Sequence, residues 1–288
     1  IDSDYEVDGI CYLLTENGEL AVTNKTTVSV DTLYIDSLED PYMEVVANRE
    51  EGRSYEGSVV VPAEVYVEEL GKTLPVVKVM TGAFMDSPEL VSVTLPESVT
   101  DMENYVFANC QNLKSTDLMC RIPRIGIRTF YNCPALKTFE IPASVSSVDE
   151  FAFDHCSVNS LTFTSALSWL CPYSFSGALS LKSITIPVAS PEDIYSEYEA
   201  AYLDNPKVIE VTKGCVLYVP QEGVEAYKAS EVWSAFANIH AIGSAAISEV
   251  EAATTVGDGP AYNLLGQPVA NPRHGDIIIR HGKKSIAE

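Results

Sequence analysis

Basic residues are scarce in this chain of 288 residues: 18 lysines and arginines stand against 41 aspartates and glutamates, and the formal net charge is −23. Nucleic acids and anionic membranes are bound through clustered positive charge, so neither is an expected partner. Apolar runs are also short, such as Val59 to Val61 and Ile277 to Ile279. A helix that crosses a bilayer needs about 20 apolar residues, so we expect no membrane insertion of the chain.

Catalytic and metal-binding motifs are missing as well. The sequence has no H-E-x-x-H, G-x-S-x-G, P-loop or G-x-G-x-x-G pattern, and its four histidines are scattered. The adjacent pair His155 and Cys156 suggests a thiol nucleophile, but Cys156 belongs to a repeated column that we expect to be buried. The sequence therefore predicts no enzyme activity, no metal site and no cofactor. A hydrolase acting on glycans or peptides remains a remote alternative, which would need convergent carboxylates or a Ser/Cys–His pair.

No C-x-x-C pair occurs among the seven cysteines. Three of them, Cys110, Cys133 and Cys156, recur at intervals of 23 residues, in a column filled by Ser87 before them and Ala178 after them. Small size is what the column shares, so we expect a ladder of buried, reduced thiols that pack as small hydrophobes. Stacked strands lie about 4.8 Å apart, so distance alone does not exclude disulfides between coils.

An internal repeat organises the middle of the sequence. A phenylalanine returns after 23, 23, 23 and 22 residues, and each is followed by an L-x-x-L-x-L-like pattern; the anchors are Phe84, Phe107, Phe130, Phe153 and Phe175. A period of 20 to 29 residues with this pattern is typical of a leucine-rich solenoid, in which each unit buries its apolar face on its neighbours. We predict a mainly β repeat solenoid, a right-handed leucine-rich-repeat coil of about seven turns with short parallel strands.

Each repeat has apolar columns that we expect to point inward and polar columns that we expect to point outward. A second apolar pair in the early repeats, such as Val145 and Val148, predicts another short strand on a second side of the coil. The outward columns are polar and lack aromatic residues, for example Ser92, Ser115 and Thr138. Such a ladder keeps an exposed sheet soluble, and weak ligand contact is the alternative interpretation.

The segments on either side of the repeats are expected to close the coil and extend it. We predict an N-terminal β-hairpin cap with an acidic, turn-rich excursion over 1–56, and the solenoid over 57–242, with regular repeats at 82–187. The solenoid includes a hairpin over 65–79, a helical insertion over 191–203 and a C-terminal helical cap over 222–237. A linker over 243–259 and a small β tail over 260–288 follow.

At these residues the chain resembles the BspA-type leucine-rich repeat family of bacterial surface and secreted proteins. The resemblance rests on five stretches: Gly82-Ala83-Phe84 with Leu90 to Pro96, Val106-Phe107 with Cys110 and Leu113, Phe130 with Cys133 and Leu136 to Pro142, Leu181 to Pro187, and Leu217 to Pro220. Tyr262 to Gln267 is similar to a secretion sorting domain. A start at Ile1 rather than Met fits a mature exported protein.

The resemblance implies an extracellular or cell-surface protein without enzyme activity that mediates adhesion-type contacts with an unknown extracellular protein or glycan. The alternative is a structural spacer that presents another part of a surface assembly. Candidate interaction residues are tyrosines of the irregular pieces, with core packing as the competing interpretation for the last three: Tyr34, Tyr42, Tyr195, Tyr198 and Tyr202.

Overall fold

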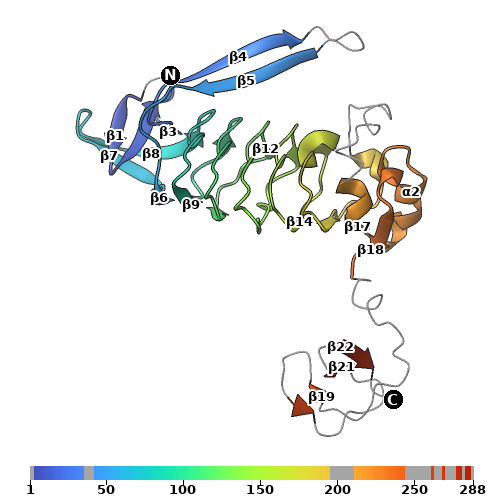
Figure 1. Cartoon of the computed structure of the whole chain (residues 1–288). Helices are drawn as coiled ribbons and strands as arrows, with labels where there is room; N and C mark the ends of the chain where they lie inside the picture. The colour runs from blue at the N-terminus through green and yellow to red at the C-terminus, as the bar shows by residue number, and fades with distance from the viewer. Residues whose placement is uncertain are drawn as a thin grey trace. The chain divides into compact units, whose positions relative to one another are not determined.

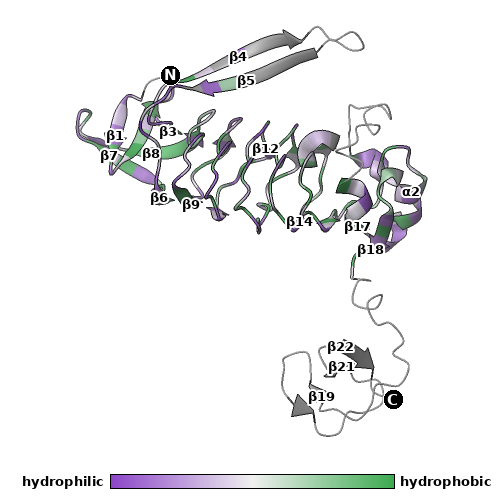
Figure 2. Ribbon diagram, viewed as in Figure 1, coloured by the Kyte–Doolittle hydropathy of each residue, from purple (hydrophilic) through white to green (hydrophobic). Residues whose placement is uncertain are grey.

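The computed structural model describes residues 3–35, 42–194 and 211–243, together with strand residues 261–262, 268–269, 277–280 and 283–286. The chain divides into two compact units, Ile1–Ile239 and His240–Glu288. The first unit is a coil whose strands stack along one axis (Figure 1). Figure 2 shows hydrophobic residues recurring from coil to coil along this unit.

The first side of the coil is built from the L-x-x-L-x-L segments. In its early part β6 (Gly57–Val60), β9 (Leu90–Leu95) and β11 (Ser115–Leu118) form one sheet in the order β11-β9-β6. Its later part contains β14 (Ser160–Thr162), β16 (Ser183–Thr185), β17 (Val216–Val219) and β18 (Asn238–Ala241), in that order. The parallel pairs match one repeat to the next, as in Val93 with Thr116 and Leu161 with Ile184.

The third repeat forms no strand over residues 136–141, where the pattern predicts one. Its column residue is Phe139, in place of the aliphatic Val93, Leu161 and Ile184. The Phe139 ring packs against Phe130 at 4.7 Å and Phe153 at 5.3 Å between ring centroids, both edge-on. The break in the sheet coincides with this bulky side chain in the core.

The second side of the coil consists of two-residue strands, which confirms the second predicted strand. They are β10 (Asp101–Met102), β12 (Arg124–Ile125), β13 (Ser147–Val148) and β15 (Trp169–Leu170). β10 pairs in parallel with the longer β8 (Lys72–Val79), which forms an antiparallel hairpin with β7 (Glu64–Val67). On this side the sheet continues through the antiparallel strands β3 (Leu20–Thr23), β2 (Ile10–Leu14) and β1 (Tyr5–Val7).

The third side, which we call the turn edge, comprises residues 82–87, 105–110, 128–133, 151–156 and 173–178. Each anchor ring stacks on the next, with centroids 5.3 Å apart for Phe84 and Phe107, 5.2 Å for Phe107 and Phe130, and 5.4 Å for Phe130 and Phe153. The backbone amides of the anchors donate to the following coil, as from Phe107 to the Thr129 carbonyl at 2.8 Å. The turn edge is therefore joined between coils by both packing and hydrogen bonds.

All seven cysteines are free and buried, which confirms the predicted burial of the column Cys110, Cys133 and Cys156. Three of the thiols also form hydrogen bonds between coils. The thiols of Cys110, Cys133 and Cys156 lie 3.1, 3.1 and 2.8 Å from the carbonyl oxygens of Phe84, Phe107 and Phe130. Each thiol donates to the anchor residue of the preceding coil, so the column adds a second inter-coil contact beside the ring stack.

The prediction of an acidic, turn-rich excursion within residues 1–56 is partly wrong, because residues 28–49 contain a long hairpin. β4 (Val28–Ile35) and β5 (Tyr42–Arg49) pair antiparallel over their whole length. Its base packs on the first coils, where Val28 and Ala47 form a buried cluster with Met85, Tyr105 and Ala108. Gly82 (φ +65°) makes room for it, because a Cβ there would lie 3.1 Å from a Val28 methyl.

The predicted helical cap over 222–237 is also wrong in detail, because it is not one continuous helix. Three short pieces replace it: the 3-10 turn η4 (Gln221–Gly223), the helix α2 (Val224–Ala229) and the 3-10 turn η5 (Trp233–Ala235). α2 ends because Ser230 adopts an extended backbone (φ −68°, ψ 137°). The Tyr227 hydroxyl donates to the Val188 carbonyl at 3.0 Å, and Trp233 packs on Tyr227.

Two further 3-10 turns, η1 (Pro172–Phe175) and η2 (Pro191–Asp193), precede residues 195–210, which lie outside the described part of the chain. The predicted helical insertion lies mostly there. The second unit contains a sheet of β19 (Ala261–Tyr262), β20 (Pro268–Val269), β21 (Ile277–Arg280) and β22 (Lys283–Ile286) in the order β20-β19-β21-β22. Its strands fall within the predicted small β tail.

One ion-pair network lies on the second side of the coil, just before the turn edge begins. The Glu103 carboxylate accepts from the Thr81 amide and hydroxyl at 2.8 and 2.7 Å and pairs with Lys78, which also reaches Asp101 at 2.9 Å. Burial raises the pKa of Glu103, but the hydrogen bonds from Lys78 and Thr81 outweigh burial and leave that pKa below its usual value. The ionised carboxylate therefore stabilises the fold.

We predict that Phe130→Ala lowers the free energy of unfolding by about 3–5 kcal/mol, because the ring is fully buried between two stacked neighbours. Chemical denaturation followed by circular dichroism measures it. Tyr66→Ala, whose residue is 57% exposed, is the control and should change stability by less than about 0.5 kcal/mol. A loss below about 1 kcal/mol for Phe130→Ala would contradict the conclusion that the stack of phenylalanine rings stabilises the coil.

We also predict that Glu103→Gln destabilises the protein by about 1–3 kcal/mol at pH 7, the range for a hydrogen-bonded charged group. The pKa of Glu103 is lower in the folded state than the reference value of 4.5, so its contribution is complete above pH 4.5 and is lost as the pH falls through the folded value. The difference between wild type and variant should thus shrink in acid. Denaturation at pH 7, 5 and 3 checks this, with Glu68→Gln at an exposed site as the control. If the difference in stability between wild type and Glu103→Gln were the same at all three pH values, ionised Glu103 would not be the source of the stabilisation.

Candidate functional site

The turn edge holds seven non-glycine residues of the repeats in the left-handed backbone region, and they fall into two columns. One column contains Asp86 (φ 52°), Asn109 (61°), Asn132 (55°) and His155 (57°). The other contains Tyr105 (58°), Arg128 (51°) and Phe151 (56°). Members of each column are 23 residues apart, so the coil places them one above the next.

The first column has a structural explanation. Aspartate and asparagine adopt the left-handed region more readily than other residues with side chains. Here their side chains also form a ladder, in which Asn109 donates to the Asp86 carboxylate at 2.8 Å and Asn132 donates to the Asn109 amide oxygen at 3.0 Å. These residues join successive turns, so we assign them to the scaffold.

The second column consists of bulky side chains, for which the left-handed region is unfavourable. Arg128 lies at its centre: the guanidinium carbon is 5.7 Å from the ring centroid of Tyr105, 5.7 Å from that of Tyr131 and 5.1 Å from that of Phe151. One guanidinium nitrogen donates to the Tyr105 hydroxyl at 2.7 Å. Distances below about 6 Å favour cation–π attraction, so one arginine organises three rings.

The rings continue along the turn edge. Phe151 stacks on Tyr173 at 5.6 Å, and Tyr131 meets His155 edge-on at 6.0 Å. Tyr105 is buried, whereas Arg128, Tyr131, Phe151 and Tyr173 are half-buried and His155 is exposed. We call this set the aromatic ridge: Tyr105, Arg128, Tyr131, Phe151, His155 and Tyr173.

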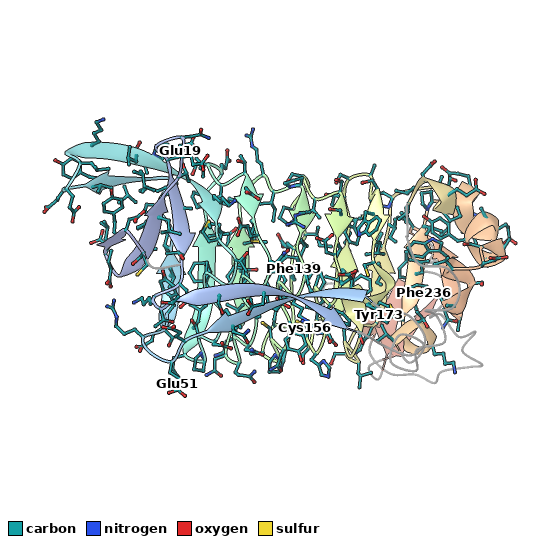
Figure 3. The ribbon with its side chains drawn as sticks, turned by 90° about the horizontal axis from the view of Figure 1, so that it is seen from above. Glu19, Glu51, Phe139, Cys156, Tyr173 and Phe236 are labelled. Atoms are coloured by element: carbon teal, nitrogen blue, oxygen red, sulfur yellow. The ribbon has the colours of Figure 1, made fainter. Side chains whose placement is uncertain are left out.

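The β4–β5 hairpin runs above the turn edge toward Tyr173 (Figure 3). At the hairpin's base, Ile127 and Tyr131 pack as partly buried residues against the cluster containing Val28 and Ala47. The ridge thus begins where the hairpin is anchored and continues beneath it.

The candidate tyrosines from the sequence lie elsewhere. Tyr34 faces Met43 and Tyr42 faces Ile35 across the hairpin, on β4 and β5, but their side chains lie outside what the structure describes. Tyr195, Tyr198 and Tyr202 fall outside the described residues altogether. Sequence reasoning missed the ridge, although Tyr105, Arg128 and Phe151 repeat with the same period of 23 as the anchors.

The outward face of the first side is polar, as predicted from its columns. Lys114, Lys137 and Lys182 are exposed on it, beside serine and threonine residues such as Ser115 and Thr138. Ser92 and Ser58 are joined at 2.8 Å between their hydroxyl oxygens, so part of the hydroxyl ladder bonds to itself. In the regular repeats the outward columns of this face carry no arginine or aromatic residue, the types that favour interface hot spots, whereas Arg128 and its rings lie on the turn edge.

Covalent chemistry finds little support among the described residues. The Nδ1 atom of His155 lies 2.7 Å from an Asp154 carboxylate oxygen, while the Cys156 thiol donates to the Phe130 carbonyl. The proposed nucleophile and base are therefore directed to different partners. Burial raises the pKa of Cys110, Cys171 and Cys215 to about 12, which keeps these thiols protonated at neutral pH.

No group of three or more His, Cys, Asp or Glu side chains suited to a metal ion occurs among the residues described. Within those residues, no helix has the length and apolar character required to cross a bilayer.

Solved structures with a similar fold are bacterial leucine-rich repeat proteins. A leucine-rich repeat protein from Bacteroides ovatus shares 21% identity with a TM-score of 0.48, over 65% of this chain and 48% of its own. The pneumococcal vaccine antigen PcpA shares 16% identity with a TM-score of 0.51, over 76% of this chain and 50% of its own. The T. pallidum leucine-rich repeat protein TpLRR shares 20% identity with a TM-score of 0.44, over 67% of this chain and 81% of its own.

These likenesses concern the fold. The chain spans about half the length of the Bacteroides ovatus protein and of PcpA. No curated protein matches the sequence at a significant level. A family model described as "BspA type Leucine rich repeat region" matches residues 123–211 with 6 copies of its repeat, over the later coils that carry Phe130, Phe153 and Phe175. This chain therefore contains a BspA-type leucine-rich repeat region, as its sequence resemblance indicated.

Proposed function

We propose that this chain is a non-enzymatic binding protein, secreted or exposed at the cell surface, that contacts an extracellular protein or glycan through the aromatic ridge. The BspA-type repeats support this class of function, because the resemblance implies surface and secreted proteins. The net charge of −23 argues against nucleic acid as the partner.

The strained column at Tyr105, Arg128 and Phe151 is the observation that carries the proposal. A left-handed backbone costs a side-chain-bearing residue about 1–2 kcal/mol, and glycine avoids this cost. Glycine does occupy the equivalent position 82 (φ +65°) of the first coil, where the hairpin base packs. In the next three coils bulky side chains are retained at that cost, and such outliers cluster at functional sites.

The composition of the ridge fits a protein or glycan surface. Tyrosine and arginine are enriched at interface hot spots, and rings held in place by packing lose little conformational freedom on binding. Arg128 pre-orients Tyr105, Tyr131 and Phe151, so a partner meets a surface that is largely formed beforehand.

The finer architecture belongs to the same proposal. We propose about seven coils in a right-handed sense, with β1 to β3 as the N-terminal cap and the α2 region as the C-terminal cap. We keep the segments 1–56, 57–242, 243–259 and 260–288, the last resembling a sorting domain. Their support is the sequence pattern together with the strand order at the first end of the coil.

A structural spacer is the second candidate function. The Phe stack and the asparagine ladder would serve a stiff support as well as a binding surface. The two candidates differ in one respect, because a spacer does not require the strained column to carry bulky side chains.

We predict that Arg128→Gly is more stable than Arg128→Ala by about 1 kcal/mol, because only glycine relieves the left-handed strain. Thermal and chemical denaturation of both variants measure the difference. Lys114, exposed and outside the left-handed set, supplies a control of opposite sign: its glycine variant should be less stable than its alanine variant by about 0.5–1 kcal/mol. If alanine were the more stable choice at both sites, the strain argument would be wrong.

We predict that ligands found by screening the full chain against glycan arrays and panels of extracellular proteins bind Arg128→Gly at least about 30-fold more weakly, the loss expected of a hot spot. Arg128→Gly suits this test because it relieves strain. Tyr173→Ala should weaken binding too, while Lys114→Ala and Lys137→Ala on the sheet face should not. Surface plasmon resonance measures each affinity. A full screen without any ligand, or affinity lost only in the lysine variants, contradicts the proposal and favours the spacer.

A further inference from the structure

The sheets on the first and second sides of the coil differ at the N-terminal end of the coil. On the second side the sheet continues past β8 through β3, β2 and β1. On the first side it ends at β6, whose one partner among the described strands is β9. β6 therefore has an open edge at the position that the strand of one more coil would occupy (Figure 1).

The alternation of hydrogen bonds along β6 shows which of its backbone groups face the open edge. The Val61 amide donates to the Thr94 carbonyl of the β9 coil at 3.0 Å. Groups alternate along a strand, so the amides and carbonyls of Ser58 and Val60 point away from β9. Gly57 (φ +63°), where the register shifts, begins this stretch.

A cavity of about 740 Å³ lies along the open edge. Ser58, Val59 and Val60 form one wall, the β1–β2 turn at Asp8 and Gly9 another, and β7 at Val65 and Tyr66 a third. Its size falls within the range of about 300–1,000 Å³ usual for binding sites. The edge is thus recessed between walls rather than open to a flat surface.

The floor of the cavity is formed in advance. Tyr55 is buried there, and its hydroxyl donates to the Thr23 carbonyl at 2.8 Å and accepts from the Cys11 amide at 3.0 Å. The Lys25 ammonium lies 5.0 Å from the Tyr55 ring centroid. These contacts join β2 and β3 to the segment before β6, so the walls keep their positions without a ligand.

β6 is short and has a register shift at its first residue, but it lacks the charged side chains that protect many edge strands against pairing. Natural edge strands carry charges or are covered, because an exposed apolar edge invites another strand. No charged residue occurs between Glu56 and Glu64, and Val60 is 67% exposed. Across the cavity Tyr66 is 57% exposed. The slot offers backbone donors and acceptors on β6 and apolar side chains at Val60 and Tyr66. Charged side chains of both signs also line it: Asp8, Lys25, Arg53, Glu56 and Glu64.

We propose that the open edge of β6 is a strand-addition site, which binds an extended segment of a partner protein with alternating apolar side chains. The backbone of such a segment pairs with Ser58 and Val60, and its apolar side chains contact Val60 and Tyr66. A second copy of this chain is disfavoured, because the β1–β2 turn and β7 form walls beside β6 that a whole coil would meet. This surface is separate from the aromatic ridge and is independent of its function.

The test selects peptides from a displayed library of random nonapeptides on the full-length chain. Synthetic versions of the enriched peptides are then measured by fluorescence anisotropy. Val60→Pro removes the outward amide and keeps the β6–β9 bonds, since proline is tolerated at an edge position whose N–H faces away from the sheet. Val60→Thr is the matched control, with the amide and the branched side chain retained.

We expect alternating apolar peptides that lose at least about tenfold in affinity on Val60→Pro, the equivalent of 1.4 kcal/mol, and that bind Val60→Thr within about threefold. Bound peptide should also slow amide exchange at Ser58 and Val60. Peptides N-methylated at alternate amides, tested on the wild-type chain, give the same information if Val60→Pro fails to fold; one methylation register should abolish binding.

Three outcomes overturn the proposal. They are a selection without enriched peptides, enriched peptides that bind equally well after N-methylation in both registers, and a dimer in sedimentation experiments that dissociates on Val60→Pro. The last result would assign the edge to a second copy of this chain.

Discussion

The stack of phenylalanine rings at the turn edge is the contact on which the rest of the coil depends. Phe107, Phe130 and their neighbours lie about one coil apart, so each ring fills the space between two others. The same residues donate their amides forward along the coil and accept thiol hydrogen bonds at their carbonyls from the next coil. Ring, amide and carbonyl of one residue type thus hold three successive turns in register.

This arrangement separates scaffold from surface on the turn edge. The anchors and thiols face the core, and the side chains of Asp86, Asn109 and Asn132 bond to one another. Arg128, Tyr131 and Phe151 belong neither to the ring stack nor to the thiol column and lie half-buried outside them. Because the framework holds the backbone in the left-handed conformation, the column can carry bulky residues. We therefore assign the proposed binding function to the outer residues of the turn edge.

The sequence was sufficient for the parts of the fold that repeat. The inward columns, the second strand and the buried thiols follow from a period of 23, because every coil sees the same neighbours. Phe139 broke the rule locally: a ring in an aliphatic column is buried as predicted, yet no strand forms around it. Apolar patterning reports burial more reliably than it reports backbone pairing.

Parts that do not repeat were predicted less well. The β4–β5 hairpin was interpreted as turn-rich because its acidic residues hide the alternation, and its pairing partner is not set by any period. The helix after Glu222 breaks at Ser230, a residue that competes for backbone hydrogen bonds. The ridge is hard to predict because its members share a period of 23 but neither residue type nor charge. Tyr105, Arg128 and Phe151 carried the signal.

Site-resolved hydrogen exchange of the full-length protein tests the central claim, that the turn edge is a rigid ladder and not a set of loops. We predict that the amides of Phe84, Phe107, Phe130 and Phe153, together with those of Tyr105 and Arg128, exchange only through opening of the whole coil. Their opening free energies should match those of the β9 and β11 amides. Amides of the turn edge that exchange much faster than those of β9 would contradict it.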